Sequence, residues 1–173
     1  MSDDLDSRFG ALRAPERVMS WERGRTPNSL CRLGTDVAES LTGLERCVQN
    51  ILLRFAATTQ NYLWAMNADG KILIAVEEIA EFDGIPNTRG YPRRRGHRHP
   101  SEDQKLGHPT LVQGGEVRIA GELALDEYGD GVRWVLNANS GRYCRQKPPR
   151  KEQVDAVVEL FRESGLDVEV DYL

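Results

Sequence analysis

The stretch that decides the fold is EVRIAGELALDEYGDGVRWVL, residues 116–136, because apolar and polar side chains alternate on both sides of a glycine-rich turn. One face of the first run carries Val117, Ile119, Gly121, Leu123 and Leu125, and the other carries Glu116, Arg118, Ala120, Glu122 and Ala124. The turn at 129–131 leads into Val132, Trp134 and Leu136, which continue the apolar face. A period of two is the period of a β-strand, so the sequence predicts a hairpin with one buried face and one solvated face.

The chain before this hairpin predicts a second hairpin and a helix. Residues 62–66 and 71–76 are apolar runs on either side of a turn that ends in Asp69-Gly70, a pair that favours tight hairpin turns. Further upstream, Asp36 and Glu39 have the spacing of a helix N-cap and its reciprocal acceptor. Apolar residues then recur at steps of three and four, at Val37, Leu41, Leu44, Val48, Ile51 and Phe55. They predict one amphipathic helix of about five turns whose whole stripe packs on the core.

The chain after the hairpin predicts a helix and a last strand. Pro148-Pro149 ends the preceding extended segment, and Gly165 stands where a helix C-cap is expected. The apolar stripe between them consists of Val154, Val157, Val158 and Phe161. Residues 166–172 alternate again. The predicted fold class is therefore α+β, a mostly antiparallel β-sheet built from hairpins, with an N-terminal amphipathic helix and a C-terminal helix followed by a strand.

Composition along the chain predicts the domain organisation. Residues 1–34 hold several prolines, glycines and arginines without a sustained period, so we expect a flexible or loosely packed N-terminal arm. Residues 35–173 then form a single α+β domain. Within it, residues 77–107 are predicted to be a long basic loop. Its run from Arg89 to His99 could bind nucleic acid or the phosphates of a nucleotide, although such runs are more often solvated loops.

Charge and motif content exclude several classes of function. The 23 basic and 27 acidic residues give a net charge of −4, so we do not expect a nucleic-acid-binding protein. No apolar run reaches the roughly 18 residues of a membrane span, and the first ten residues lack the pattern of a signal peptide. We therefore expect a cytoplasmic protein, or one secreted into a target cell without a classical signal peptide. The three cysteines have no C-x-x-C spacing, which argues against a disulfide framework and a thiolate zinc site.

Two segments combine small residues with chemically active ones. They are HPTLVQGG, residues 108–115, and NANSGRYC, residues 137–144. Glycine beside a strand marks a bulge, a turn or a close approach of backbone. The order of the hairpin brings the second segment back toward the start of the first, so we expect both to line one concave end of the sheet.

These residues also carry a resemblance to a known family. His108-Pro109-Thr110-Leu111, Gly114-Gly115, Ala120-Gly121 and Ser140-Gly141-Arg142-Tyr143 stand in the order of that family's motifs. Over roughly residues 62–172 the chain resembles a domain shared by plant IQ-motif calmodulin-binding proteins and bacterial effector or polymorphic-toxin proteins. The resemblance implies an α+β fold and, for the bacterial members, delivery into other cells. Many of these relatives carry histidine where this chain has Arg142.

The first functional hypothesis is an effector- or toxin-like enzyme that transfers or hydrolyses a group from a phosphate-bearing nucleotide, with ATP or NAD as the donor and a nucleotide or protein as the substrate. The candidate catalytic residues are His108 for proton transfer, Ser140 for holding phosphate, Arg142 for neutralising charge, and Tyr143 for stacking or for orienting the histidine. The candidate ligand-binding residues are Thr110, Gly114, Gly115 and Gly141. No structural metal is expected, because His97, His99 and His108 lack a further ligand in fixed register.

Each of these residues also has a structural interpretation. His108 could simply bond a backbone carbonyl, Ser140-Gly141 could end a strand as a turn, and Arg142 could form an exposed salt bridge. Cys144 is more readily a buried cysteine than a nucleophile paired with the histidine. The alternative function is therefore a non-catalytic protein-binding module of the regulatory or immunity type. In that hypothesis the sheet face, with Arg118 and Arg133, contacts a protein partner or activator.

Overall fold

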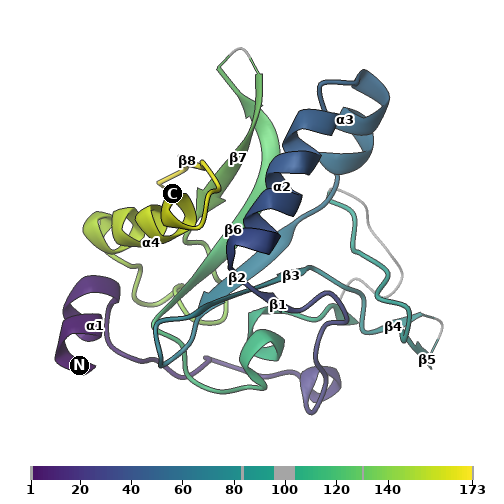
Figure 1. The fold of residues 1–173 in the computed structure, drawn as a ribbon. Helices are drawn as coiled ribbons and strands as arrows, with labels where there is room; N and C mark the ends of the chain where they lie inside the picture. The colour runs from purple at the N-terminus through teal and green to yellow at the C-terminus, as the bar shows by residue number, and fades with distance from the viewer. Residues whose placement is uncertain (1, 83, 96–103, 130, 173) are drawn as a thin grey trace.

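A six-stranded sheet forms the centre of the molecule (Figure 1). The computed structural model describes residues 2–82, 84–95, 104–129 and 131–172. In spatial order the strands are β1 (Cys31–Arg32), β3 (Ile72–Val76), β2 (Tyr62–Met66), β6 (Ile119–Tyr128), β7 (Gly131–Asn137) and β8 (Glu169–Val170). Only the β7–β8 pair is parallel among these neighbours. The predicted α+β class with a mostly antiparallel sheet is confirmed.

Helices cover one face of this sheet and enclose the main core. They are α1 (Ser2–Phe9), α2 (Thr35–Cys47) and α4 (Lys151–Glu163). The indole N–H of Trp134 in β7 donates to the carbonyl oxygen of Leu41 in α2 at 2.9 Å. The ring of Trp64 in β2 meets Phe161 of α4 edge to face, with 6.3 Å between the ring centroids. The two fully buried tryptophans thus tie the central strands to the helices.

Both predicted hairpins are present. β2 and β3 pair from Tyr62 with Val76 to Met66 with Ile72, and β6 and β7 pair from Glu122 with Asn137 to Tyr128 with Gly131. The expectation of one solvated face on β6 is wrong, however. Arg118, just before the strand, is 2% exposed, and Ala120 is fully buried. Ala120 is covered by a second apolar cluster on that face, supplied by the short helix η3 (His108–Val112) and by residues 143–144. Arg118 is covered by α1, where it contacts Asp6.

The single helix predicted from Asp36 to Phe55 is wrong. The chain forms α2, then breaks, and starts a separate helix α3 (Ile51–Ala57). The N-cap of α2 is Gly34, so Asp36 lies inside the first turn and does not cap it. At the break, the side chain of Asn50 accepts a hydrogen bond from the amide of Leu52 at 3.0 Å and caps the new helix. Asparagine favours such caps over helix interiors, which explains the interruption.

The C-terminal predictions are confirmed. The stripe of α4 is buried, and Gly165 has φ +98° just after its last turn. The amide of Gly165 donates to the carbonyl of Arg162, and the amide of Leu166 donates to that of Phe161. This pattern satisfies the last carbonyls of the helix and turns the chain into β8.

Residues 2–34 differ from the flexible or loosely packed arm that we predicted. Phe9 is 2% exposed in the main core, and β1 pairs with β3. A short helical turn, η1 (Ser20–Glu22), carries a buried glutamate. Arg118 forms an ion pair with Asp6 of α1. Apolar and polar contacts with the rest of the protein therefore hold this segment in place. The sequence does not predict them, because residues 1–34 have no sustained period of apolar residues.

The segment 77–107 is more ordered than a solvated loop in its described parts. Residues 96–103, which include His97 and His99, lie outside the described residues. β4 (Glu81–Phe82) and β5 (Ile85–Pro86) form a small two-stranded sheet. Glu77 and Glu78 are 2% and 0% exposed. No helix in the described part of the chain is long and apolar enough to cross a membrane.

Candidate functional site

The two segments predicted to converge do meet, on the face of the sheet opposite the main helices. The hydroxyl of Tyr143 donates to the carbonyl oxygen of Gly115 at 2.8 Å, which joins the end of one segment to the end of the other. Around this bond the buried apolar residues are Leu63, Ala65, Leu111, Val117, Ala120, Tyr143 and Cys144. The meeting place is thus the second apolar cluster.

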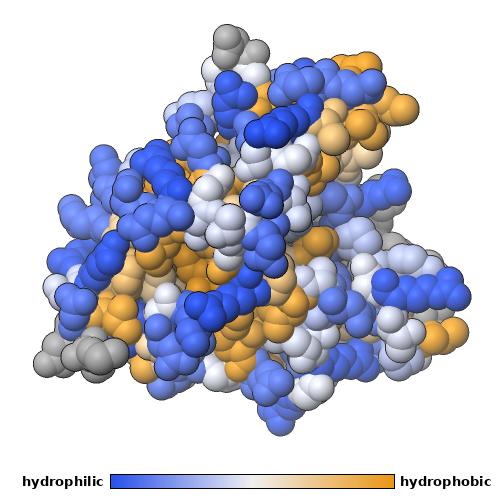
Figure 2. All heavy atoms as spheres, viewed as in Figure 1, coloured by the Kyte–Doolittle hydropathy of each residue, from blue (hydrophilic) through white to orange (hydrophobic). Residues whose placement is uncertain are grey.

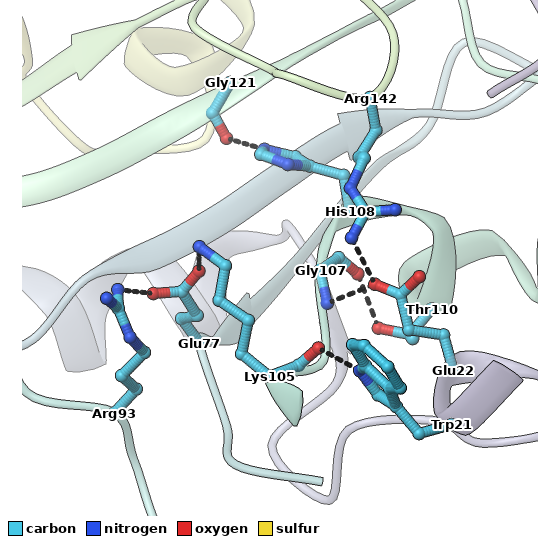
Figure 3. A network of polar contacts seen from close by, with 10 residues as sticks. All are labelled: Trp21, Glu22, Glu77, Arg93, Lys105, Gly107, His108, Thr110, Gly121 and Arg142. Atoms are coloured by element: carbon cyan, nitrogen blue, oxygen red, sulfur yellow. Dashed lines mark hydrogen bonds and ion pairs between the residues drawn. The ribbon is translucent and has the colours of Figure 1, made fainter. Parts of the chain in front are cut away.

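His108 opens η3 and is 5% exposed. Its Nε2 lies 2.8 Å from the carbonyl oxygen of Gly121 in β6, and it must carry the proton because a carbonyl only accepts (Figure 3). Burial lowers the pKa of this imidazole from 6.5 to about 4, although the bond to Gly121 and the nearby Glu77 act in the opposite direction. The ring is therefore neutral at pH 7. The contact agrees with the structural interpretation of His108, in which the ring bonds a backbone carbonyl.

Arg142 connects three parts of the chain. Its Nη2 lies 3.4 Å from Oε1 of Glu22, and its Nη1 donates to the carbonyl of Arg17 at 3.1 Å. The same glutamate oxygen accepts the amide of Gly107 at 3.0 Å, directly before His108 (Figure 3). The Arg142 side chain is 13% exposed, so the pair is mostly buried and the guanidinium already has a carboxylate partner.

The remaining residues of the first segment are also engaged within the protein. The hydroxyl of Thr110 donates to the carbonyl of Gly107 at 2.7 Å. The amide of Gly114 donates to Pro109 and that of Gly115 to Val112, at 2.7 and 2.9 Å. A turn whose amides are bonded to its own carbonyls offers none of them to a phosphate. The geometry therefore gives Thr110, Gly114 and Gly115 the role of closing the turn after η3.

Tyr143 and Cys144 are likewise held by main-chain carbonyls. Burial raises the pKa of the Tyr143 hydroxyl, and Glu22 raises it further. The thiol of Cys144 donates to the carbonyl of Ala120 at 3.4 Å, and burial raises its pKa. A protonated, buried thiol is a poor nucleophile. The structural interpretation of Cys144 agrees with this geometry.

Ser140 and Gly141 stand apart from the other candidates. They line a cavity of about 670 Å³ between the loop after β7, the start of α4 and the last described residues of the chain. His108, Arg142 and Tyr143 do not line it. The structure thus divides the predicted site into a buried network around the histidine and an open cavity at the serine.

Sequence reasoning missed the buried carboxylates. Glu77 accepts Nη1 of Arg93 at 3.0 Å and Nζ of Lys105 at 2.6 Å (Figure 3). Glu78 accepts the amides of Asn28 and Ser29 at 3.1 and 2.8 Å. Their signal in the sequence is the Glu77-Glu78 pair directly after the apolar run 71–76, at the start of the predicted basic loop. These bonds satisfy both carboxylates inside the protein, so we assign them to holding the segments around η3.

The described residues contain no group of three or more histidine, cysteine, aspartate or glutamate side chains placed to hold a metal ion. Burial raises the pKa of the Glu122 carboxyl, and the charge of Glu77 raises it further. Comparison of the chain with protein-family models, with curated proteins and with solved structures found no match. The family resemblance and the nucleotide-dependent activity remain predictions.

Proposed function

We propose that the chain is a non-catalytic protein-binding module of the regulatory or immunity type, and that it recognises its partner through the apolar face of α3. The observation that carries the proposal is the exposure of Ile51, Leu52 and Phe55, at 75%, 76% and 78%. Figure 2 shows apolar residues gathered at the upper right, where α3 lies in Figure 1. Large apolar side chains grouped on a surface mark interaction sites.

The helix that carries these side chains is anchored to the body of the protein. Val48 before it and Ala57 at its end are buried. Nε of Arg54 donates to the carbonyl of Val48 at 3.2 Å, and the Asn50 cap holds the first turn. An anchored helix presents its outer side chains in one arrangement, which reduces the entropy lost on binding.

The partner that fits this face is a different protein with an apolar groove. These three side chains of α3, together with Leu53 at 45% exposure, offer roughly 500 Å². Two copies packed face to face would bury roughly 1,000 Å², about half of the area at which obligate homodimers begin. A groove on another protein can surround two turns of this helix, so it buries a larger area than a flat contact between two copies does. Residues 46–68 include Arg46 and Arg54 but no aspartate or glutamate, so the complementary groove has an acidic rim.

The engagement of the candidate catalytic groups also favours a binding role over catalysis. His108, Tyr143 and Arg142 each hold a main-chain or carboxylate partner inside the protein. This contact surface differs from the sheet face with Arg118 and Arg133 that the sequence predicts for a binding module. Arg118 is buried and bonded to Asp6 and Gly10, so it cannot reach a partner.

Site-specific photo-crosslinking tests the proposal. A photoreactive phenylalanine analogue replaces Leu52, and a control carries it at Ile85, which is 69% exposed in the separate β4–β5 sheet. In native cells, we expect an adduct with one distinct protein from position 52 and none from position 85. No adduct at position 52, or adducts only with a second copy of the chain, would contradict the proposal.

Affinity measurements with the protein identified in that adduct complete the test. Leu52→Asp and Phe55→Asp should each weaken binding by about tenfold or more, because they place a charge in an apolar contact. Ile85→Asp is the matched control, since it also places a charge on an exposed apolar position, and it should bind as the unmodified chain does. Equal affinity for all four proteins would show that the adduct did not report the proposed contact.

A further inference from the structure

The cavity at Ser140 has the size and the enclosing elements of a ligand site. Its volume of about 670 Å³ lies within the range of pockets that hold small organic ligands. The first turn of α4 forms one wall, and Asp171 and Tyr172 from the end of the chain form another. It is separate from α3, so the inference below is independent of the proposed protein-binding function.

The charged groups around the cavity favour an anion. Arg145 and Lys151 line it, and Asp171 is the one carboxylate of the described lining. Lys151 begins α4, a helix of 13 residues, and lines the cavity at the N-terminal end of this helix. The positive end of the helix dipole therefore adds to the two cations.

Ser140 provides an observation of a different kind. The residue is 1% exposed, and its Oγ has no hydrogen-bond partner in the structure. Three other serine hydroxyls, those of Ser29, Ser40 and Ser164, all donate to protein oxygens. A buried hydroxyl without a partner destabilises the folded protein. Because Ser140 lines the cavity, a ligand oxygen that reaches its Oγ would supply the missing partner.

The backbone beside the serine is open to such a ligand. No atom lies within 4 Å of the point where a Cβ on Gly141 would stand, so a ligand group can approach the main chain there. The carbonyl of Ser140 accepts the amides of Tyr143 and Cys144 at 3.3 and 2.9 Å, which fixes the turn. The ring of Tyr172, with Nζ of Lys151 at 4.8 Å from its centroid, supplies an aromatic surface.

We propose that this cavity binds a phosphate monoester with a planar ring, of mononucleotide size. The phosphate would accept hydrogen bonds from Ser140 and the Gly141 amide and pair with Arg145 and Lys151. The ring would stack on Tyr172. No chemical step is assigned to the site, because the histidine lies in the separate buried network.

Binding of AMP, adenosine and inorganic phosphate tests this, measured by calorimetry and by the amide NMR shifts of Gly141 and Lys151. We expect AMP to bind, phosphate to bind more weakly at the same amides, and adenosine to bind least. Ser140→Ala and Lys151→Gln should each weaken AMP binding by about tenfold. Lys71→Gln, an exposed lysine at the β2–β3 turn, is the matched control and should leave it unchanged.

The serine variant separates a ligand role from a structural one. Removing an unsatisfied hydroxyl should not lower the Tm, so Ser140→Ala should lose affinity while it keeps its stability. Equal binding of adenosine and AMP, unchanged affinity in both cavity variants, or no response to any probe up to about 10 mM would each overturn the proposal.

Discussion

Nε2 of His108 donates to the carbonyl oxygen of Gly121 across 2.8 Å, and this bond joins the start of η3 to the first part of β6. The imidazole is buried, and its pKa is about 4 in the folded chain against 6.5 ordinarily. The folded state therefore favours the neutral ring. A residue chosen from the sequence for proton transfer near pH 7 is, in this fold, a neutral donor to the backbone.

The first prediction is a loss of stability in mild acid. Between pH 6.5 and about 4 the unfolded histidine binds a proton that the folded one does not, so the free energy of unfolding falls as the pH is lowered through this interval. The total loss is on the order of 3 kcal/mol, and none of it is felt above pH 7. Urea unfolding at several pH values measures it. In His108→Gln, which keeps an N–H donor, this part of the pH dependence should disappear; parallel curves for the two proteins would contradict the assignment.

The second prediction concerns Gly121. A Cβ at this position would stand 1.9 Å from the carbonyl oxygen of Asn137, which is main chain and cannot turn aside. Gly121→Ala should therefore destabilise the protein by about 3 kcal/mol or more, or prevent folding. Gly43→Ala in α2 is the control, because a Cβ there meets no atom within 4 Å. It should stabilise the chain by about 0.5–1 kcal/mol in the same urea titration. Equal effects of the two changes would contradict the prediction that the nearby Asn137 carbonyl is what requires glycine at position 121.

Local patterns account for the parts of the fold that the sequence predicts well. The hairpins and the stripe of α4 depend on period and turn residues within about 20 positions, which sequence displays directly. The stripe from Val48 to Phe55 has the same helical period whether it meets a core or water. Only the cap at Asn50 marks the break, and a single asparagine competes with six apolar positions in that pattern.

The candidate site shows the same division between local and distant information. Hairpin connectivity was enough to predict that the segments at 108–115 and 137–144 meet. It could not show which groups are already engaged, because the partner of Arg142 is Glu22, 120 residues away in the chain. The amide of Gly107 and its carboxylate partner are 85 residues apart. No spacing rule connects such positions, so the sequence does not predict these buried carboxylates.

The third prediction distinguishes the cysteines by reactivity. Cys144 is buried with a raised pKa, whereas Cys47 is exposed at the end of α2. With iodoacetamide at pH 8, Cys47 should be modified at least about 100-fold faster than Cys144 in the folded protein. Peptide mass spectrometry over time gives both rates. In urea the two rates should become similar, and a fast native reaction at Cys144 would restore it as a candidate nucleophile.

The fourth prediction concerns Asp6, the ion-pair partner of Arg118. The guanidinium is 2% exposed and also donates to the carbonyls of Gly10 and Ala68, each at 3.2 Å, so it joins α1 to the sheet. Asp6→Ala leaves this charge buried without a carboxylate. Because the Asp6 side chain is 42% exposed and partly screened by water, we expect a loss of about 1–2 kcal/mol, less than for a fully buried pair.

Hydrogen exchange locates that loss in the structure. The amides of α1 should exchange faster in Asp6→Ala, and those of β6 should change less, because the apolar contacts of Phe9 with the core remain. Asp4→Ala, at an exposed position of the same helix, should alter the free energy of unfolding by no more than about 0.5 kcal/mol. Equal unfolding free energies and exchange rates in Asp6→Ala and Asp4→Ala would contradict this prediction. They would mean that apolar contacts alone hold the first helix, and that the carbonyls of Gly10 and Ala68 are enough to stabilise the buried charge of Arg118.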